Sequence, residues 1–251
     1  NEQVGTGRCG DLQGRRPSER ARGAVKFLLT NDDGVEAPGL QALLRAVSRF
    51  GSAVVVAPQL PHSGCGHQAT VDRPLRIEQR AEGQWAVSGT PVDCVRLALL
   101  HVDPDVDWVL SGVNDGANLG VDTYMSGTVA AAREAALFGK RAIAVSHYRH
   151  TGQEIDWNGA AQQTARVLKQ LLSQSLEART SWNINLPAAA RQTEPPLVVC
   201  PLDPHPLPVA YQQEAGDFHY RTNYHRRRRE PGADVDVCFR GEVSATLLKH
   251  Q

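Results

Sequence analysis

Asp32 and Asp33 stand side by side in the stretch TNDDG, directly after the apolar run VKFLL. Side chains alternate along a strand, so both carboxylates can reach one ligand only where the chain curls, which Gly34 permits. Two carboxylates packed together raise each other's pKa unless a cation offsets the repulsion. Oxygen ligands of this kind suit Mg²⁺, Mn²⁺ or Ca²⁺ rather than zinc. The pair therefore indicates a divalent-cation site, although from this stretch alone an Asp-rich turn that caps the next helix is an equal alternative.

Two later loops carry similar side chains. The stretch QLPHSGCGH follows the apolar run AVVVAP, and NDGANLG, with Asn114, Asp115 and Asn118, follows DWVLSG. Ligands in open α/β sheets bind outside the carboxyl ends of the strands, so the three loops are expected to open on one rim. NDGANLG lacks the G-x-G-x-x-G spacing of a dinucleotide-binding fingerprint. Taken alone, it is equally well interpreted as an irregular loop with left-handed asparagines.

The run SGTVAAAREAAL predicts an anion site at the start of a helix. Ser126, Gly127 and Thr128 open an alanine-rich helix, whose unpaired backbone N–H groups and positive dipole end favour a phosphate. Ordinary N-capping by the two hydroxyl residues is the simpler alternative. Thr90, in SGTPVDCV, marks a second helix start that either joins the same rim or only caps its own helix.

The other polar candidates are histidines and one run of arginines. His62 and His67 flank Ser63 in the second loop, so either is a candidate general acid. Three further histidines are interpreted as surface residues: His205, His219 and His225. The run Arg226–Arg229 is interpreted as a solvated face, although its charge would also attract phosphorylated substrates.

The elements that position these residues alternate between short apolar runs and helical patterns. Strands are expected at residues 25–29, 53–58, 106–113, 141–147 and 181–187, and helices at 39–51, 90–101, 128–139 and 159–174. Residues 75–80 and 84–89 are expected to form a hairpin or edge pair. This alternation predicts an α/β fold with a three-layer, Rossmann-like and mostly parallel sheet, and right-handed crossovers.

The chain is expected to divide into three segments. Residues 1–24 form a polar extension, expected to be disordered, that has no apolar core of a signal peptide. Residues 25–186 form the catalytic core. Residues 187–251 form an irregular β-rich appendage, since eight prolines fall between Pro187 and Pro231, and this segment returns to the core through residues 241–248. The appendage is also the expected C-terminal oligomerisation segment.

Composition bears on the class of partner and on the cellular compartment. Basic and acidic residues number 27 each, so the net charge gives no indication of a nucleic-acid polymer or a membrane surface as partner. The five cysteines are widely spaced without a C-x-x-C pair, which argues against a disulfide framework and for a reducing compartment. No apolar run approaches the ~20 residues that span a bilayer. A cytoplasmic protein is expected.

Six stretches together resemble the SurE (survival protein E) family of metal-dependent nucleotidases and acid phosphatases. They occur in the family's order and extend the resemblance from Val25 to about Leu248. The stretches are LLTNDDGVEAPGL, VVVAPQLPHSGCGHQAT, VSGTPVDCVRLAL, VLSGVNDGANLG, YMSGTVAAAREAALFGKRAIAVS and WNINLP.

The resemblance implies a set of site residues and a reaction. One divalent metal ion, Mg²⁺ or Mn²⁺ and in crystals also Ca²⁺, would be held by four ligands: Asp32, Asp33, Ser63 and Asn114. Asp32 and Asp33 would also be the catalytic residues. Asn118, Ser126, Gly127 and Thr128 correspond to positions that line the family's phosphate pocket. The implied activity is hydrolysis of nucleoside 5′-monophosphates by metal-activated water, extending to 3′-monophosphates and short polyphosphate. The implied assembly is a homodimer or tetramer that exchanges C-terminal segments.

Two departures from the family pattern bear on activity. Asp115 stands where an uncharged or basic residue is more familiar, and Arg141 stands where proline is usual. The extra carboxylate would alter metal preference or phosphate affinity. A nucleotide- and metal-binding sensor with little or no catalysis is therefore an alternative function. A nicotinamide-dependent reductase that uses the glycine-rich loops is a second alternative, against which the missing fingerprint counts.

Overall fold

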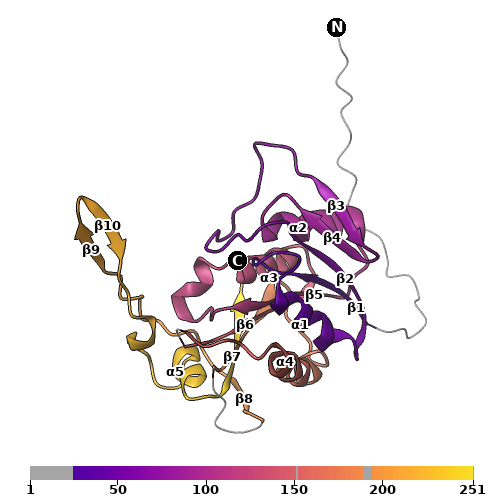
Figure 1. The fold of residues 1–251 in the computed structure, drawn as a ribbon. Coiled ribbons are helices and arrows are strands. Elements are labelled where there is room, and N and C mark those ends of the chain that lie inside the picture. The colour runs from indigo at the N-terminus through magenta and orange to yellow at the C-terminus, as the bar shows by residue number, and fades with distance from the viewer. Residues whose placement is uncertain (1–24, 151, 189–193, 251) are drawn as a thin grey trace.

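The computed structural model describes residues 25–150, 152–188 and 194–250, and the expected extension 1–24 lies outside them. Within these residues one nine-stranded sheet has the order β3-β4-β2-β1-β5-β6-β7-β11-β8 (Figure 1). Its strands are β1 (Val25–Thr30), β2 (Gly51–Pro58), β3 (Ile77–Ala81), β4 (Gln84–Val87), β5 (Trp108–Asp115), β6 (Arg141–His147), β7 (Thr180–Leu186), β8 (Leu197–Val199) and β11 (Val243–Lys249). Neighbours are parallel except β3 with β4 and β7 with β11. The predicted α/β fold with a mostly parallel sheet is confirmed, as is the hairpin.

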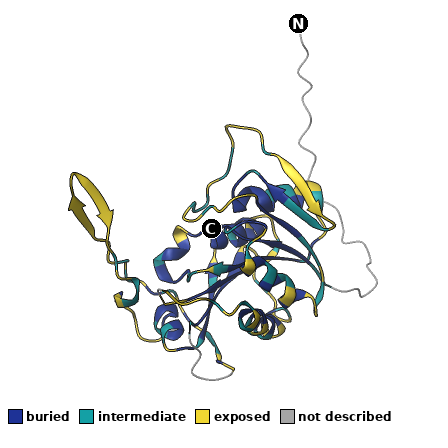
Figure 2. Cartoon of the chain, in the orientation of Figure 1, coloured by how far each residue is buried: buried dark blue, intermediate teal, exposed yellow. Residues whose placement is uncertain are grey.

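Helices cover both faces of this sheet. Helices α1 (Pro38–Val47) and α4 (Trp157–Leu171) pack on one face, and α2 (Pro91–Leu97) and α3 (Gly127–Leu137) pack on the other. Strand β1 contributes to both cores, because Phe27 and Leu29 face the α1–α4 side while Leu28 faces α2 and α3. The central strands are therefore buried on both faces, as Figure 2 shows. The loops that follow these strands begin at the carboxyl edge of the sheet.

The starts of α2 and α3 follow the capping signals in the sequence. Thr90 accepts a hydrogen bond from the backbone N–H of Asp93, and the Asp93 carboxylate accepts one from the backbone N–H of Thr90 at 2.9 Å. Ser126 accepts one from the backbone N–H of Val129 at 3.0 Å. Both helix ends are thereby fixed at the level where the parallel strands end.

The C-terminal segment leaves the sheet and comes back to it. After β8 it forms a small hairpin of β9 (Tyr211–Glu214) and β10 (Asp217–Tyr220), then α5 (Asp234–Phe239). Every residue of the two hairpin strands is exposed, and the hairpin extends away from the sheet (Figures 1 and 2). Strand β11 then inserts between β7 and β8, which confirms the predicted return through residues 241–248.

The expectation of a solvated face at Arg226–Arg229 is wrong for one residue. The side chain of Arg227 is fully buried and donates from Nη1 to Oδ2 of Asp122 at 2.8 Å. Tyr224 donates its hydroxyl to the same oxygen at 2.6 Å. A buried carboxylate is stable only when it is hydrogen-bonded or paired with a cation. Arg227 is buried because it supplies that pairing to Asp122. This contact joins the C-terminal segment to the 3₁₀ turn Gly120–Tyr124 that follows β5.

Among the described residues, no helix combines the length and the apolar character needed to cross a membrane.

Candidate active site

The two aspartates lie in a curl of the chain at the end of β1. Asn31 closes this curl by accepting from the backbone N–H of Gly34 at 3.2 Å and donating to the Gly34 carbonyl at 2.9 Å. Gly34 has φ +107°, which a side chain would strain, so the glycine in TNDDG is required by the backbone. Asp32 is buried and Asp33 is partly exposed. The predicted departure from strand geometry is therefore present.

Asp32 packs against the first turn of α3. The hydroxyl of Thr128 donates to Oδ1 of Asp32 at 2.5 Å. A Cβ added to Gly127 would meet Oδ2 of Asp32 at 3.0 Å and its Cβ at 2.9 Å, so only glycine fits between the helix and the carboxylate. The structure thus brings together residues that the sequence assigned to two different sites, one for a metal and one for a phosphate. Ser126 caps the helix, so the simpler alternative for this residue also holds.

Both aspartates have raised pKa values. Burial raises the pKa of Asp32, and the Thr128 hydrogen bond and the charge of His62 oppose this rise. Burial and the charge of Asp32 raise the pKa of Asp33 to about 6, with a further contribution from the charge of Asp115. A cation beside the pair would relieve these unfavourable charges.

The carboxyl end of β5, where the stretch NDGANLG begins, carries the third predicted ligand. Asn114 donates from Nδ2 to the carbonyl of Gly116 at 2.7 Å, so its Oδ1 remains as an oxygen donor. The backbone N–H of Asp115 donates to Oδ2 of Asp33 at 3.3 Å, which links this loop directly to the aspartate pair. The predicted convergence of the loops after β1 and β5 is therefore observed.

Asn118 lies deeper in the same loop and is buried. Its Nδ2 donates to the hydroxyl of Ser146 at 2.7 Å, and its backbone carbonyl accepts from the amides of Asn183 and Asn185 at 2.8 and 3.1 Å. Sequence reasoning missed these three supporting residues. The signal was present in WNINLP, where two asparagines two positions apart lie in a strand that is otherwise apolar, and therefore share one face.

The loop after β2 is attached to the site at several points. The backbone N–H of His62 donates to the carbonyl of Asp32 at 2.7 Å, which brings the neighbouring Ser63 to this rim. Ser63 is exposed, and no described hydrogen bond fixes its hydroxyl. The thiol of Cys65 reaches the first turn of α3, because a Cβ on Gly127 would meet it at 2.9 Å. Burial and the charge of Asp32 raise the pKa of Cys65.

His67 is engaged away from the aspartates. Its Nε2 contacts Oε2 of Glu134 on α3 at 2.7 Å, and Nη1 of Arg133 lies 3.3 Å from its Nδ1. Arg96 of α2 donates to the other oxygen of Glu134 at 2.5 Å. Of the two histidines considered as an acid, His62 is bonded to Asp32 through its backbone and its charge acts on the Asp32 carboxylate, whereas His67 anchors the loop. Thr90 also serves this loop, since its hydroxyl donates to the carbonyl of Gln68 at 2.6 Å.

The donor set favours a hard cation. Among the described residues there is no group of three or more His, Cys, Asp or Glu side chains arranged to hold a metal. What the rim offers instead is two carboxylates, one amide oxygen and one exposed hydroxyl, all oxygen donors of the kind that Mg²⁺ and Mn²⁺ accept. The raised pKa values of the aspartates fit the same cation.

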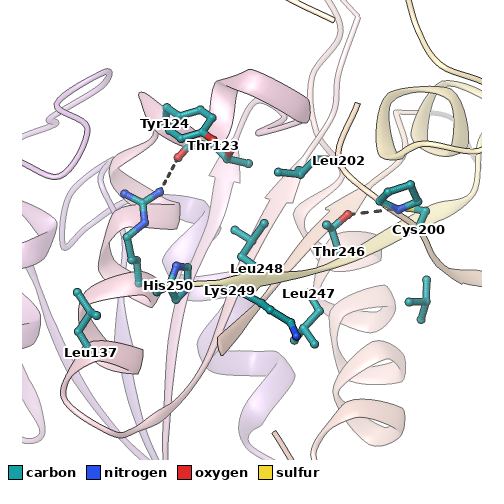
Figure 3. Close-up of a pocket in the computed structure, with 13 residues that line it drawn as sticks. Thr123, Tyr124, Leu137, Cys200, Leu202, Thr246, Leu247, Leu248, Lys249 and His250 are labelled. Carbon is teal, nitrogen blue, oxygen red and sulfur yellow. Dashed lines mark hydrogen bonds between the residues drawn. The ribbon is translucent and has the colours of Figure 1, made fainter. Parts of the chain in front are cut away.

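A cavity of about 770 Å³ lies elsewhere, between α3 and the β8–β11 edge. Tyr124, Arg133, Leu137 and His250 contribute to its walls. Figure 3 labels three of them, Tyr124, Leu137 and His250, together with Thr246 and Leu248 of β11. The lining residues do not include Asp32, Asp33 or Asn114. The chemistry described above therefore belongs to the rim and not to this cavity.

Comparison with known proteins gives a consistent result. A family model described as survival protein SurE matches residues 27–203. The chain is 49% identical over 226 residues to a Nostoc sp. protein named "Putative 5'-nucleotidase alr3139", covering 90% of this chain and all of that one. It is 46% identical over 180 residues to the 5'-nucleotidase SurE of Pelobacter propionicus, covering 69% and 71%. The crystal structure of the SurE protein from Aquifex aeolicus superposes with a TM-score of 0.79 at 32% identity, covering 89% of this chain and 93% of that one.

Proposed function

The chain belongs to the SurE family, and we propose that it is a metal-dependent phosphomonoesterase that hydrolyses nucleoside monophosphates, with 5′-nucleotidase activity. One observation carries the proposal. The aspartate pair at the end of β1 contacts both the first turn of α3, through Thr128, and the carboxyl end of β5, through the backbone of Asp115. The proposed cation site and the proposed phosphate-binding helix end would therefore lie side by side, as phosphoryl transfer to water requires.

We assign the cation to Asp32, Asp33, Ser63 and Asn114. The bound cation would neutralise charge on the phosphate oxygens and lower the pKa of the attacking water. Its identity, Mg²⁺ or Mn²⁺, is part of the proposal.

The chain's own groups hold the phosphate and move the proton. The backbone N–H groups at the start of α3, near Gly127 and Thr128, point toward the rim and favour a phosphate there. Asn118 keeps one amide hydrogen beyond the one it donates to Ser146, and can donate it to a phosphate oxygen. Water attacks phosphorus in line and gives up a proton to a carboxylate of the pair, and the bond from phosphorus to the ester oxygen breaks as that oxygen takes up a proton from solvent. The products are inorganic phosphate and the nucleoside.

Asp33 is the better placed of the two aspartates to accept the proton of the attacking water. One oxygen of Asp32 already accepts the Thr128 hydroxyl, and Asp32 is buried. Asp33 is more exposed, and burial together with its charged neighbours brings its pKa to about 6. A base whose pKa lies near neutrality transfers protons efficiently.

The finer properties are proposed on the same basis. We include 3′-monophosphates and short polyphosphate among the substrates, since the phosphate contacts do not involve the nucleoside. Assembly into a homodimer or tetramer through the C-terminal segment is supported by the exposed β9–β10 hairpin. A cytoplasmic location is supported by the free thiols of the four described cysteines.

A phosphate-release panel tests the function. Purified protein is given 5′-AMP, 3′-AMP, p-nitrophenyl phosphate or tripolyphosphate, each with Mg²⁺ or Mn²⁺, and inorganic phosphate is measured. Release that EDTA abolishes and excess metal restores is the expected result. Metal-dependent binding of AMP without phosphate release would favour the sensor alternative, for which Asp115 is the motivating residue. Quenching of NADH fluorescence without phosphate release would favour the reductase.

A further inference from the structure

A charged pair at the edge of the site joins two residues that are 34 positions apart in the sequence. The Nε of Arg149 donates to Oδ1 of Asp115. Asp115 is next to the proposed ligand Asn114, and its backbone N–H donates to Oδ2 of Asp33 at 3.3 Å. Strands β5 and β6 run parallel with Asp115 opposite His147, so the residues just after β6 lie along the same rim. Through its contact with Asp115, Arg149 is therefore held next to the proposed cation site.

This pair changes the charge that a phosphate would meet. The carboxylates of Asp32 and Asp33 are neighbours, and Asp115 adds a third negative charge at the same rim, since its backbone N–H donates to Oδ2 of Asp33 at 3.3 Å. One divalent cation balances only two of these three negative charges. A phosphate dianion would then approach a surplus negative charge, unless another cationic group is present. Arg149 is the guanidinium that contacts Asp115.

The contact leaves the other donors of Arg149 available. Only Nε is used by Asp115, and within the described residues the terminal nitrogens of Arg149 form no hydrogen bond. The side chain is 41% exposed, so it can move without leaving a packed core. A guanidinium presents its planar fork of N–H groups to phosphate oxygens, often two at a time.

We propose that Arg149 is a phosphate-binding residue of this site, held at the rim by Asp115 and donating its terminal N–H groups to the phosphate of the bound nucleotide. The inference rests on the proposed function for the identity of its ligand. It gives Asp115 a role as well, because the extra carboxylate positions the arginine that offsets it.

The competing explanation is that Arg149 only neutralises Asp115. A double-mutant cycle separates the two roles, because a neutralising arginine has no function once Asp115 is uncharged. The variants are Arg149→Ala, Arg149→Lys, Asp115→Asn and the double variant Asp115→Asn with Arg149→Ala. Arg80→Ala is the matched control, since Arg80 is similarly exposed on the edge strand β3 and pairs with Glu78 at 3.3 Å.

The measurements are calorimetric binding of AMP and of inorganic phosphate with Mn²⁺ present, and KM and kcat with AMP, all on the full chain. We expect Arg149→Ala to weaken binding by about 10- to 100-fold, the range of one charge-assisted contact. KM should rise with kcat little changed, because the contact is made in the ground state and kept in the transition state. Arg149→Lys should recover part of the loss. Arg80→Ala should change binding less than about twofold.

The decisive comparison is made in the Asp115→Asn background. We expect Arg149→Ala to weaken binding there as well, by a smaller factor, because Asp115→Asn weakens the contact that holds Arg149 at the rim. Equal binding by the Asp115→Asn protein with and without Arg149 would overturn the inference, as would wild-type binding by Arg149→Ala alone. Wild-type protein that binds AMP but releases no phosphate would overturn the nucleotidase proposal only, because the Arg149 comparison is calorimetric. Wild-type protein that binds neither AMP nor inorganic phosphate would overturn both.

Discussion

Removing the hydroxyl of Thr128 tests the link between α3 and the aspartate pair. Thr128 is fully buried and donates to the buried Asp32 carboxylate at 2.5 Å. Thr128→Val keeps the shape of the side chain and removes the donor. A hydrogen bond to a charged group contributes about 1.5–3 kcal/mol, which corresponds to about 10- to 150-fold in an equilibrium constant. Because this bond lowers the pKa of Asp32, its loss raises that pKa further and favours the protonated carboxylate over metal binding.

The expected result of Thr128→Val is a Mn²⁺ affinity weaker by that factor at pH 7, with phosphate release from AMP reduced at limiting metal. Calorimetry measures the first quantity and a phosphate assay the second. Thr128→Ser is the matched control, since it keeps the hydroxyl and loses one methyl group, and it should stay within about threefold of wild type. Wild-type metal affinity in Thr128→Val would refute the argument that α3 keeps Asp32 ionised. Equal losses in both variants would show that packing is responsible instead.

Three further predictions concern the charges around the site. Asp32→Asn should reduce turnover at least ~100-fold with an unchanged circular dichroism spectrum, and near-wild-type turnover would contradict the assignment. Since burial and neighbouring carboxylates raise the pKa of Asp33 to about 6 in the folded chain, metal-free protein should lose stability as the pH rises from 4 to 6. Added Mn²⁺ should accordingly raise the melting temperature more at pH 7 than at pH 5, whereas Asp33→Asn should reduce both effects, with Asp32 left as the carboxylate of raised pKa. Burial opposes ionisation of Glu134, but hydrogen bonds from His67 and Arg96 outweigh it and hold its pKa below 4.5. Ionised Glu134 therefore stabilises the folded chain above that pH, and this stabilisation is lost as the pH falls and Glu134 is protonated. Glu134→Gln should lower the free energy of unfolding by about 1–3 kcal/mol at pH 7 and by less at pH 4. A difference in denaturant midpoint between variant and wild type that is the same at both pH values would contradict this.

The fold was predictable because its signals are local. The run at residues 53–58 contains no polar residue, which is typical of a strand covered on both faces, and it forms the end of β2. Thr90 and Asp93 carry a capping box that needs only four residues of sequence. The return of residues 241–248 to the sheet was also predictable from their apolar pattern. Their place between β7 and β8 was not, because strand order depends on contacts between distant segments.

The site was predictable as a convergence of loops and not as a set of contacts. Topology fixes that the loops after β1 and β5 share a rim, so TNDDG and NDGANLG could be placed together. The partner of each side chain depends on distances that the sequence does not encode locally. Nothing in the run Arg226–Arg229 indicates that Arg227 is the arginine buried against Asp122. The pairing of Asp115 with Arg149 is equally nonlocal.

The position of Asp32 explains why a cation and a phosphate would depend on each other here. The start of α3 was expected to bind a phosphate, yet in the structure its first turn is already in contact with the Asp32 carboxylate through Gly127 and Thr128. A phosphate dianion brought to the same helix end would be repelled by that carboxylate and by its neighbour Asp33. A divalent cation between the aspartates and the phosphate would replace this repulsion with attraction, since it attracts the carboxylates and the phosphate alike. Phosphate binding should therefore be strongly metal-dependent, even though the helix end offers its N–H groups without any metal.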